Sequence, residues 1–176
     1  MILFSMENEI KKLKEIVESN PNNINAWINL AQVYYNNGDI DKSIDSFKVA
    51  LEIEPKNALI MQNLGYLYNE KGEYVEAILI LKKALEIDPN LSIASTELSF
   101  SYLEIGDFEN TIKTCKNALK INPKDEVAWT NLGSAYYNQK NYDKAIEALK
   151  KALNIIPNLE FAQKVLDLAE KAKKEN

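Results

Sequence analysis

The chain has 176 residues, 46% of them hydrophobic, and a net charge of −5. This composition is typical of a folded soluble chain and disfavours nucleic acid as a partner. There is no histidine and no arginine, so the usual general base, the commonest metal ligand and the best phosphate-clamping side chain are all missing.

The single cysteine, Cys115, bears on both redox compartment and chemistry. It cannot form an internal disulfide, which fits a reducing cytoplasm. Its place among apolar repeat positions favours a packed thiol over a reactive one.

Residues 1–23 begin the chain. Ile10, Leu13 and Val17 fall on one face of a helix predicted over Met6–Ser19. We expect this helix to cap the repeats that follow. Met1–Phe4 is apolar but too short to span a membrane, and would either pack on the cap or extend it.

The prolines then set the organisation of the chain. They recur every 34 residues, at Pro21, Pro55, Pro89, Pro123 and Pro157. A fixed period of this length marks an architecture of stacked repeats. The period predicts four repeats, at 24–57, 58–91, 92–125 and 126–159.

Each repeat is predicted to form two helices. The first has apolar residues at repeat positions 3, 7, 10 and 11, and the second at positions 17, 21, 24, 27 and 28. A glycine followed by an acidic residue separates the helices in three repeats, at Gly38, Gly72 and Gly106. One helix pair cannot bury its own apolar face, so successive pairs must stack.

The segment 160–176 ends the chain. Glu160–Lys174 is predicted to be a solvating helix with lysines on one side. Its packed side would carry Phe161, Ala162, Leu166 and Ala169. We expect the two end segments and the four repeats to form one domain.

The recurring residues resemble those of the tetratricopeptide repeat family. The family's Trp-x2-Leu-Gly-x2-Tyr pattern appears in the fourth repeat as Trp129, Leu132, Gly133 and Tyr136. In the first repeat it appears as Trp27, Leu30, Ala31 and Tyr34. The departures are Met61 and Ser95 in place of tryptophan, Cys115 in place of a larger apolar residue, and Lys140 in place of glycine. The resemblance implies an all-α fold, a right-handed α-solenoid of stacked antiparallel helix pairs with capping helices at both ends.

The resemblance also implies a concave groove lined by the first helix of each pair. Seven of its 24 lining positions are asparagine, whose amide can pair with an extended peptide backbone or merely with the local backbone and water. Aromatic residues at other lining positions would supply contact area or pack on neighbouring helices. The candidate peptide-binding residues are Asn29, Tyr35, Asn63, Tyr66, Glu70, Glu97, Phe100, Glu104, Asn131 and Tyr137.

The charge pattern limits the kind of peptide segment that we expect the groove to bind. No lysine occurs at positions 1–13 of any repeat, whereas four glutamates do. Such a groove favours a neutral or basic segment with apolar anchors. Family members that hold an acidic chaperone tail use a basic clamp, and the positions for its cations here are Ile28, Leu59, Ile93 and Glu97. We therefore expect no tight binding of an acidic chaperone tail.

Three functions stand as hypotheses. The favoured one is a non-catalytic, cytoplasmic adaptor that binds an extended or helical segment of another protein, without nucleic acid, membrane, metal or cofactor. The alternative is structural self-association into a homo-oligomer through the ends, aided by Met1–Phe4. An enzyme is disfavoured because Glu97 and Glu104 lie about 10 Å apart along one helix, too far for paired acid–base work.

Overall fold

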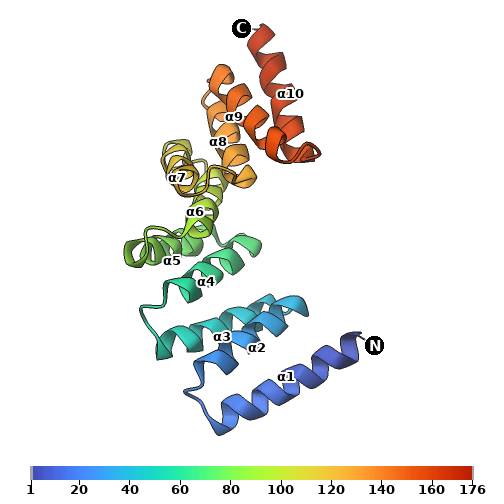
Figure 1. Ribbon diagram of the computed structural model, residues 1–176, viewed down its shortest axis with the longest axis vertical. Helices are drawn as coiled ribbons and strands as arrows, with labels where there is room; N and C mark the ends of the chain where they lie inside the picture. The colour runs from blue at the N-terminus through green and yellow to red at the C-terminus, as the bar shows by residue number, and fades with distance from the viewer. Residues whose placement is uncertain (1, 176) are drawn as a thin grey trace. The chain divides into compact units, whose positions relative to one another are not determined.

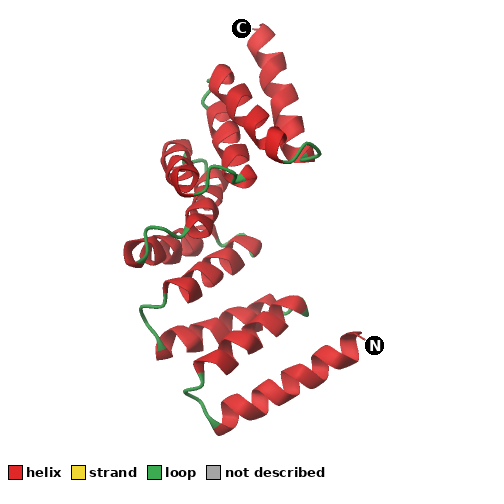
Figure 2. Cartoon of the chain, viewed as in Figure 1, coloured by secondary structure: helices red, strands yellow, loops and turns green. Residues whose placement is uncertain are grey.

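The computed structural model describes residues 2–175, with side chains from residue 7 onward. Every regular element among these residues is a helix (Figures 1 and 2). The order is α1 (Ile2–Ser19), then the pairs α2 (Ile24–Asn36) and α3 (Ile40–Ile53), α4 (Ala58–Glu70) and α5 (Tyr74–Ile87), α6 (Ser92–Glu104) and α7 (Phe108–Ile121), α8 (Glu126–Asn138) and α9 (Tyr142–Ile155), and finally α10 (Glu160–Glu175).

The chain divides into two compact units, unit 1 (Met1–Ile87) and unit 2 (Asp88–Asn176). Unit 1 holds α1 to α5 and unit 2 holds α6 to α10. Within each unit the second helix of one pair packs on the first helix of the next, α3 on α4 and α7 on α8. The helix pairs of the predicted fold are confirmed, whereas the joining of all four repeats into one domain stays a prediction.

Side-chain caps fix where several first helices begin. Asn23 and Asp125 accept hydrogen bonds from the backbone N–H groups of Ala26 and Ala128, at 3.1 and 2.8 Å. These bonds satisfy amides that have no partner inside the helix.

The turns between paired helices use a left-handed backbone. Gly38, Gly72 and Gly106 have φ of 82°, 75° and 78°. Lys140 takes the same place in the fourth repeat with φ 60°, although a Cβ atom makes this conformation costlier by roughly 1–2 kcal/mol. The backbone of this turn is therefore set by the helix pair around it, not by the residue at its centre.

A small residue at repeat position 8 lets the two helices of a pair approach closely. A Cβ atom added to Gly133 would lie 2.5 Å from Leu149, and one added to Gly65 would meet Leu81. In the third repeat the same two positions hold Ser99 and Cys115, both fully buried, and the Ser99 hydroxyl donates to the Thr96 carbonyl at 2.7 Å. A polar pair thus replaces the glycine–leucine contact in this repeat.

Both ends are capped. On α1, Val17 is buried and packs with the core of the first helix pair, as predicted. The predicted cap extends further, because α1 begins at Ile2; Met1 lies outside the described residues.

The C-terminal cap needs one correction. On α10, Ala162, Leu166 and Ala169 are buried as expected, but Phe161 is 55% exposed. Val165 is buried in its place and completes the packed face with Leu166.

Candidate peptide-binding surface

The ten candidate residues fall into one group in each unit. Unit 1 carries five of them on α2 and α4, and unit 2 carries five on α6 and α8. The unit 1 group is Asn29, Tyr35, Asn63, Tyr66 and Glu70, and we call it the α2/α4 surface. The unit 2 group is Glu97, Phe100, Glu104, Asn131 and Tyr137, and we call it the α6/α8 surface.

A tyrosine pair joins the two helices of the α2/α4 surface. The rings of Tyr35 and Tyr66 meet edge to face, with centroids 5.7 Å apart and an interplanar angle of 74°. Their hydroxyl oxygens lie 2.6 Å apart in a hydrogen bond. Both side chains are half-buried, so they present fixed aromatic edges instead of mobile ones.

Amide and apolar groups accompany the tyrosines. Asn29 is exposed and Asn63 is half-buried. Gln32, also exposed, donates to the side chain of Asn36 at 3.1 Å. Leu59 at the start of α4 is 58% exposed. The surface therefore combines open hydrogen-bonding groups with an uncovered aliphatic side chain.

Acidic charge prevails at the C-terminal end of α4. Glu70 is exposed there. The neighbouring Lys71 ammonium lies 2.8 Å from Asp41 and 2.7 Å from Glu73. Hydrogen bonds to these two carboxylates raise the pKa of Lys71, so it stays charged and is neutralised by them. It leaves no uncompensated cation next to Glu70.

The α6/α8 surface is more closed. Asn131 is only 4% exposed, and its amide donates to the Ser99 hydroxyl at 3.1 Å. The hydroxyl of Thr96, also buried, lies 2.6 Å from the Asp125 carboxylate. We predicted that Asn131 would pair with a guest backbone, but its side chain is used inside the fold. The site proposed below omits it.

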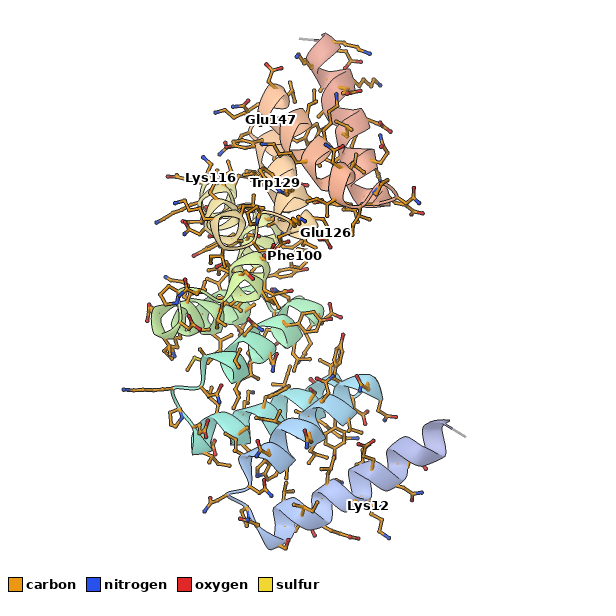
Figure 3. All side chains as sticks on the ribbon, in the orientation of Figure 1. Lys12, Phe100, Lys116, Glu126, Trp129 and Glu147 are labelled. Carbon is orange, nitrogen blue, oxygen red and sulfur yellow. The ribbon has the colours of Figure 1, made fainter. Side chains whose placement is uncertain are left out.

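The other members of the α6/α8 surface vary in exposure. Glu104 is exposed, whereas Glu97 and Phe100 are half-buried and already engaged with neighbours. Tyr137 is half-buried against Tyr142, with ring centroids 6.0 Å apart. Figure 3 shows Phe100 on α6. These residues offer partial contact area rather than an open wall.

The described residues show little other chemistry. Among their side chains no cluster of three or more carboxylates or thiols could hold a metal ion. None of the helices α1 to α10, over its described residues, combines the length and apolar content of a membrane-spanning segment. Cys115 is fully buried, and burial raises the pKa of its thiol to about 12, which favours packing over reactivity.

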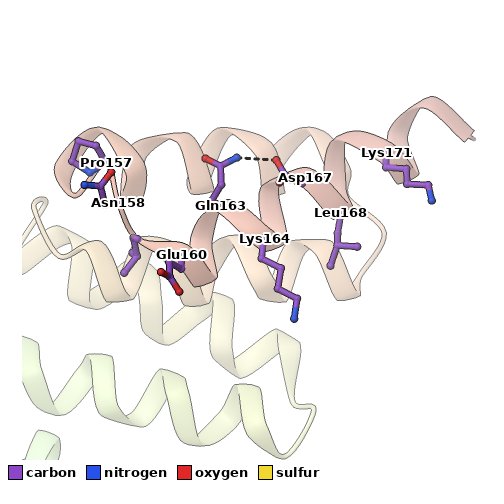
Figure 4. Close-up of a pocket in the computed structure, with 9 residues that line it drawn as sticks. Pro157, Asn158, Glu160, Gln163, Lys164, Asp167, Leu168 and Lys171 are labelled. Carbon is purple, nitrogen blue, oxygen red and sulfur yellow. Dashed lines mark hydrogen bonds between the residues drawn. The ribbon is translucent and has the colours of Figure 1, made fainter.

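Cavities also occur where the sequence predicted none. One of about 740 Å³ follows the exposed face of α10, where Gln163 donates to Asp167 at 2.8 Å (Figure 4). Two more lie beside Trp27 and Trp129. The lysines around them lie on α1, α3, α7 and α9, and the likeness of the two cavities shows only when residues 102 apart, three repeat lengths, are compared.

Known proteins match this fold. The crystal structure of MamA has 25% sequence identity, covers 83% of this chain and 85% of its own, and gives a TM-score of 0.78. YrrB, described as a TPR protein with an unusual peptide-binding site, has 21% identity over 92% of this chain and 84% of its own, with a TM-score of 0.79. The first TPR of Spaghetti (RPAP3), solved with the HSP90 peptide SRMEEVD, has 24% identity over 66% of this chain and 93% of its own, with a TM-score of 0.64.

The sequence comparisons agree with the structural ones. No curated protein sequence matches the chain. Family profiles described as tetratricopeptide repeat match residues 23–90, 94–125 and 127–159. With the repeated helix pairs and the small residues that seat them, these matches show that the chain belongs to the tetratricopeptide repeat family.

Proposed function

We propose that this protein is a non-catalytic adaptor whose α2/α4 surface binds an extended or helical segment of another protein. The segment is neutral or basic and carries apolar anchors. The observation that carries the proposal is the combination, on neighbouring first helices, of the open amide of Asn29, the locked Tyr35–Tyr66 pair and the uncovered Leu59.

Each of these groups suits a peptide in a different way. An exposed amide donates and accepts at once, so it can pair with a main chain. The half-buried tyrosines offer aromatic area that is already ordered, which lowers the entropic cost of binding. Leu59 offers an apolar contact for an anchor side chain. Glu70 adds a negative charge that favours a basic residue in the guest.

The similar structures support the role in general terms. YrrB is described with a peptide-binding site, and the Spaghetti domain was solved with a bound peptide. That peptide is acidic, whereas the matching cation positions on α2 and α4 of this chain hold Ile28 and Leu59, both apolar. We therefore propose that this chain does not take an acidic chaperone tail at this surface.

Selection of random twelve-residue peptides displayed on phage tests the proposal. The selected peptides should carry apolar anchors and a net charge of zero or above. A variant with Asn29→Ala and Leu59→Ser should bind the best peptide about tenfold more weakly by fluorescence anisotropy, a loss of about 1.4 kcal/mol. Both side chains are exposed enough for the fold to survive, which circular dichroism would check.

The matched control is Lys48→Ala, an exposed residue on α3. Its affinity for the selected peptide should equal that of the native chain. Selection of acidic peptides, or equal binding by the Asn29/Leu59 variant, would contradict the proposal.

Self-association through the ends is kept as a second candidate. This candidate rests on the apolar segment Met1–Phe4, which lies outside the residues whose side chains the structure describes. Removal of residues 1–5 should convert a dimer to a monomer in light scattering if the ends associate. A cytoplasmic location stays a prediction from the single cysteine.

A further inference from the structure

Among the residues that the structure describes, unit 1 and unit 2 each hold a cavity of the same kind. The cavity in unit 1 has about 370 Å³ and lies among α1, α2 and α3; its residues include Lys14, Glu18, Trp27, Tyr34 and Val49. The cavity in unit 2 has about 500 Å³ and lies among α7, α8 and α9; its residues include Lys116, Lys120, Trp129, Tyr136 and Glu147. We call them the Trp27 cavity and the Trp129 cavity. Equivalent residues stand 102 apart, which is three 34-residue repeats.

The apolar floor is the same in both cavities. Each tryptophan donates its indole N–H to a proline carbonyl, Trp27 to Pro21 at 2.8 Å and Trp129 to Pro123 at 3.0 Å. A leucine and a tyrosine beside each tryptophan are buried, and a lysine ammonium lies 5.4 or 5.5 Å from that tyrosine's ring centre. The floor is thus a product of the repeat, and it is preformed in both units.

The rim differs between the two cavities. Lys120 replaces Glu18, and Lys151 replaces Val49, which lines the Trp27 cavity. The Lys151 ammonium lies 4.5 Å from the ring centre of Trp129 and 2.8 Å from the Glu147 carboxylate. Figure 3 shows Lys116, Trp129 and Glu147 on the three helices that enclose this cavity.

The charge that remains at the Trp129 cavity is positive. Glu147 is the only acidic residue among the described residues that line it, and Lys151 already pairs with that carboxylate and lowers its pKa. Lys116 and Lys120 are exposed and form no ion pair with any described residue. The Trp27 cavity, by contrast, has two lysines balanced by Glu18 and Asp45.

We propose that the Trp129 cavity binds a short acidic segment of a partner protein that carries one central apolar side chain. The apolar side chain packs on Trp129 and Leu132, and carboxylates on either side of it pair with Lys116, Lys120 and Lys144. A volume of about 500 Å³ falls within the range of preformed ligand sites, about 300–1,000 Å³.

The arrangement of the lysines favours a peptide over a lipid. Lys116 and Lys120 lie on α7, whereas Lys144 lies on α9. Cations therefore border the apolar floor on two helices, which suits an anchor flanked by acids on both sides. A lipid carries its charge at one end only. This site differs from the α2/α4 surface in both its helices and its preferred charge.

A direct binding measurement tests the site. The probe is a fluorescein-labelled ten-residue peptide of aspartate and glutamate with one central phenylalanine, used at about 0.05 M salt so that screening stays weak. The native chain should bind it with a stoichiometry of one by calorimetry. K116E/K120E should bind it at least about tenfold more weakly, because it reverses two unpaired charges at the rim.

The Trp27 cavity supplies matched controls within the same chain. Lys14→Glu, at the position equivalent to Lys116, should leave the affinity unchanged. E18K/V49K gives the Trp27 cavity the rim of the Trp129 cavity and should raise the stoichiometry from one to two. A stoichiometry that stays at one would show that rim charge does not create the site and would overturn the proposal.

Three other results would overturn it as well. Equal binding of a peptide with serine in the central position would mean that charge alone attracts the probe. Binding to phosphatidylglycerol vesicles that K116E/K120E abolishes, without binding of the peptide, would assign the site to a membrane. A dimer in sedimentation that the same variant dissociates would assign it to a second copy of this chain.

Discussion

Asn29 in unit 1 and Asn131 in unit 2 occupy the same repeat position but differ in side-chain exposure. Asn29 is exposed on α2, whereas Asn131 is buried on α8 and bonded to Ser99 on α6. The Asn131 side chain meets Ser99, at position 8 of the preceding first helix. The helix before α2 is α1, which packs on it through Val17, and Asn29 is exposed.

Neighbouring first helices also pack differently in the two units. α6 packs on α8 more closely than α2 packs on α4. Several buried side chains on α6 and α8 are small, among them Ser99, Thr130 and Ser134. Tyr35 and Tyr66 fill the corresponding space between α2 and α4. A helix surface in this chain is therefore open or closed according to the size of its partners, even where the repeat position is the same.

The largest expected effect is the loss of stability when a core leucine of either unit is truncated. Leu81 and Leu149 are fully buried, each against a glycine of the paired helix. Truncating either to alanine should lower the free energy of unfolding by about 2–5 kcal/mol. Hydrogen exchange should rise in unit 1 for Leu81→Ala and in unit 2 for Leu149→Ala.

The control for this pair is Lys82→Ala, an exposed residue on α5 that should change stability by less than about 0.5 kcal/mol. Faster exchange throughout the chain in both leucine variants would mean that the two units unfold together.

The next largest effect is the difference in stability loss between alanine substitutions of the two asparagines. Asn131→Ala leaves the Ser99 hydroxyl without its buried donor, and should lower the free energy of unfolding by about 1–3 kcal/mol in urea. Asn29→Ala should change it by less than about 0.5 kcal/mol, because that amide is solvated. Equal losses in the two variants would contradict the difference in burial.

The smallest expected effect is a pH dependence of stability that comes from the Cys115 thiol in unit 2. Burial raises the pKa of Cys115 from its ordinary value of 9.0 to about 12 in the folded chain. Its contribution to stability is complete below pH 9 and is lost as pH rises toward 12, because only the unfolded thiol ionises in that window. The loss should reach about 1 kcal/mol at pH 10.

The measurement compares the native chain with Cys115→Ser in urea between pH 7 and pH 10. Serine does not titrate there, so the native chain should lose stability more steeply. Parallel pH profiles would mean that the thiol is accessible. The equivalent residue of unit 1, Phe47, contributes no such dependence.

Periodicity predicted the helices well because it depends on spacing alone. The repeat positions of glycine and proline predicted the ends of α2 to α9 within a few residues. The apolar pattern was wrong at Phe161, which is exposed, and Val165 completes the packed face of α10 instead. Spacing alone does not determine which of these apolar residues meets the core.

The candidate surface was harder to predict. The family resemblance predicted which way each candidate side chain faces. Its exposure also depends on the side chains that contact it from the neighbouring helix. Asn131 is buried and donates to the Ser99 hydroxyl, whereas its counterpart in unit 1, Asn63, follows a helix with Ala31 at that place and is half-buried. The pattern of a single helix does not predict the Trp129 cavity, because its lysines lie on two helices, α7 and α9.

The shared floor of the two tryptophan cavities has a consequence for how such a chain can change its ligands. The leucines that hold the helices together, Leu30 and Leu132, are buried beneath each cavity, whereas Glu18, Lys116 and Lys120 are exposed on the rim. Substitution of these three rim residues should therefore alter recognition at one cavity and leave the other unchanged, with little effect on folding.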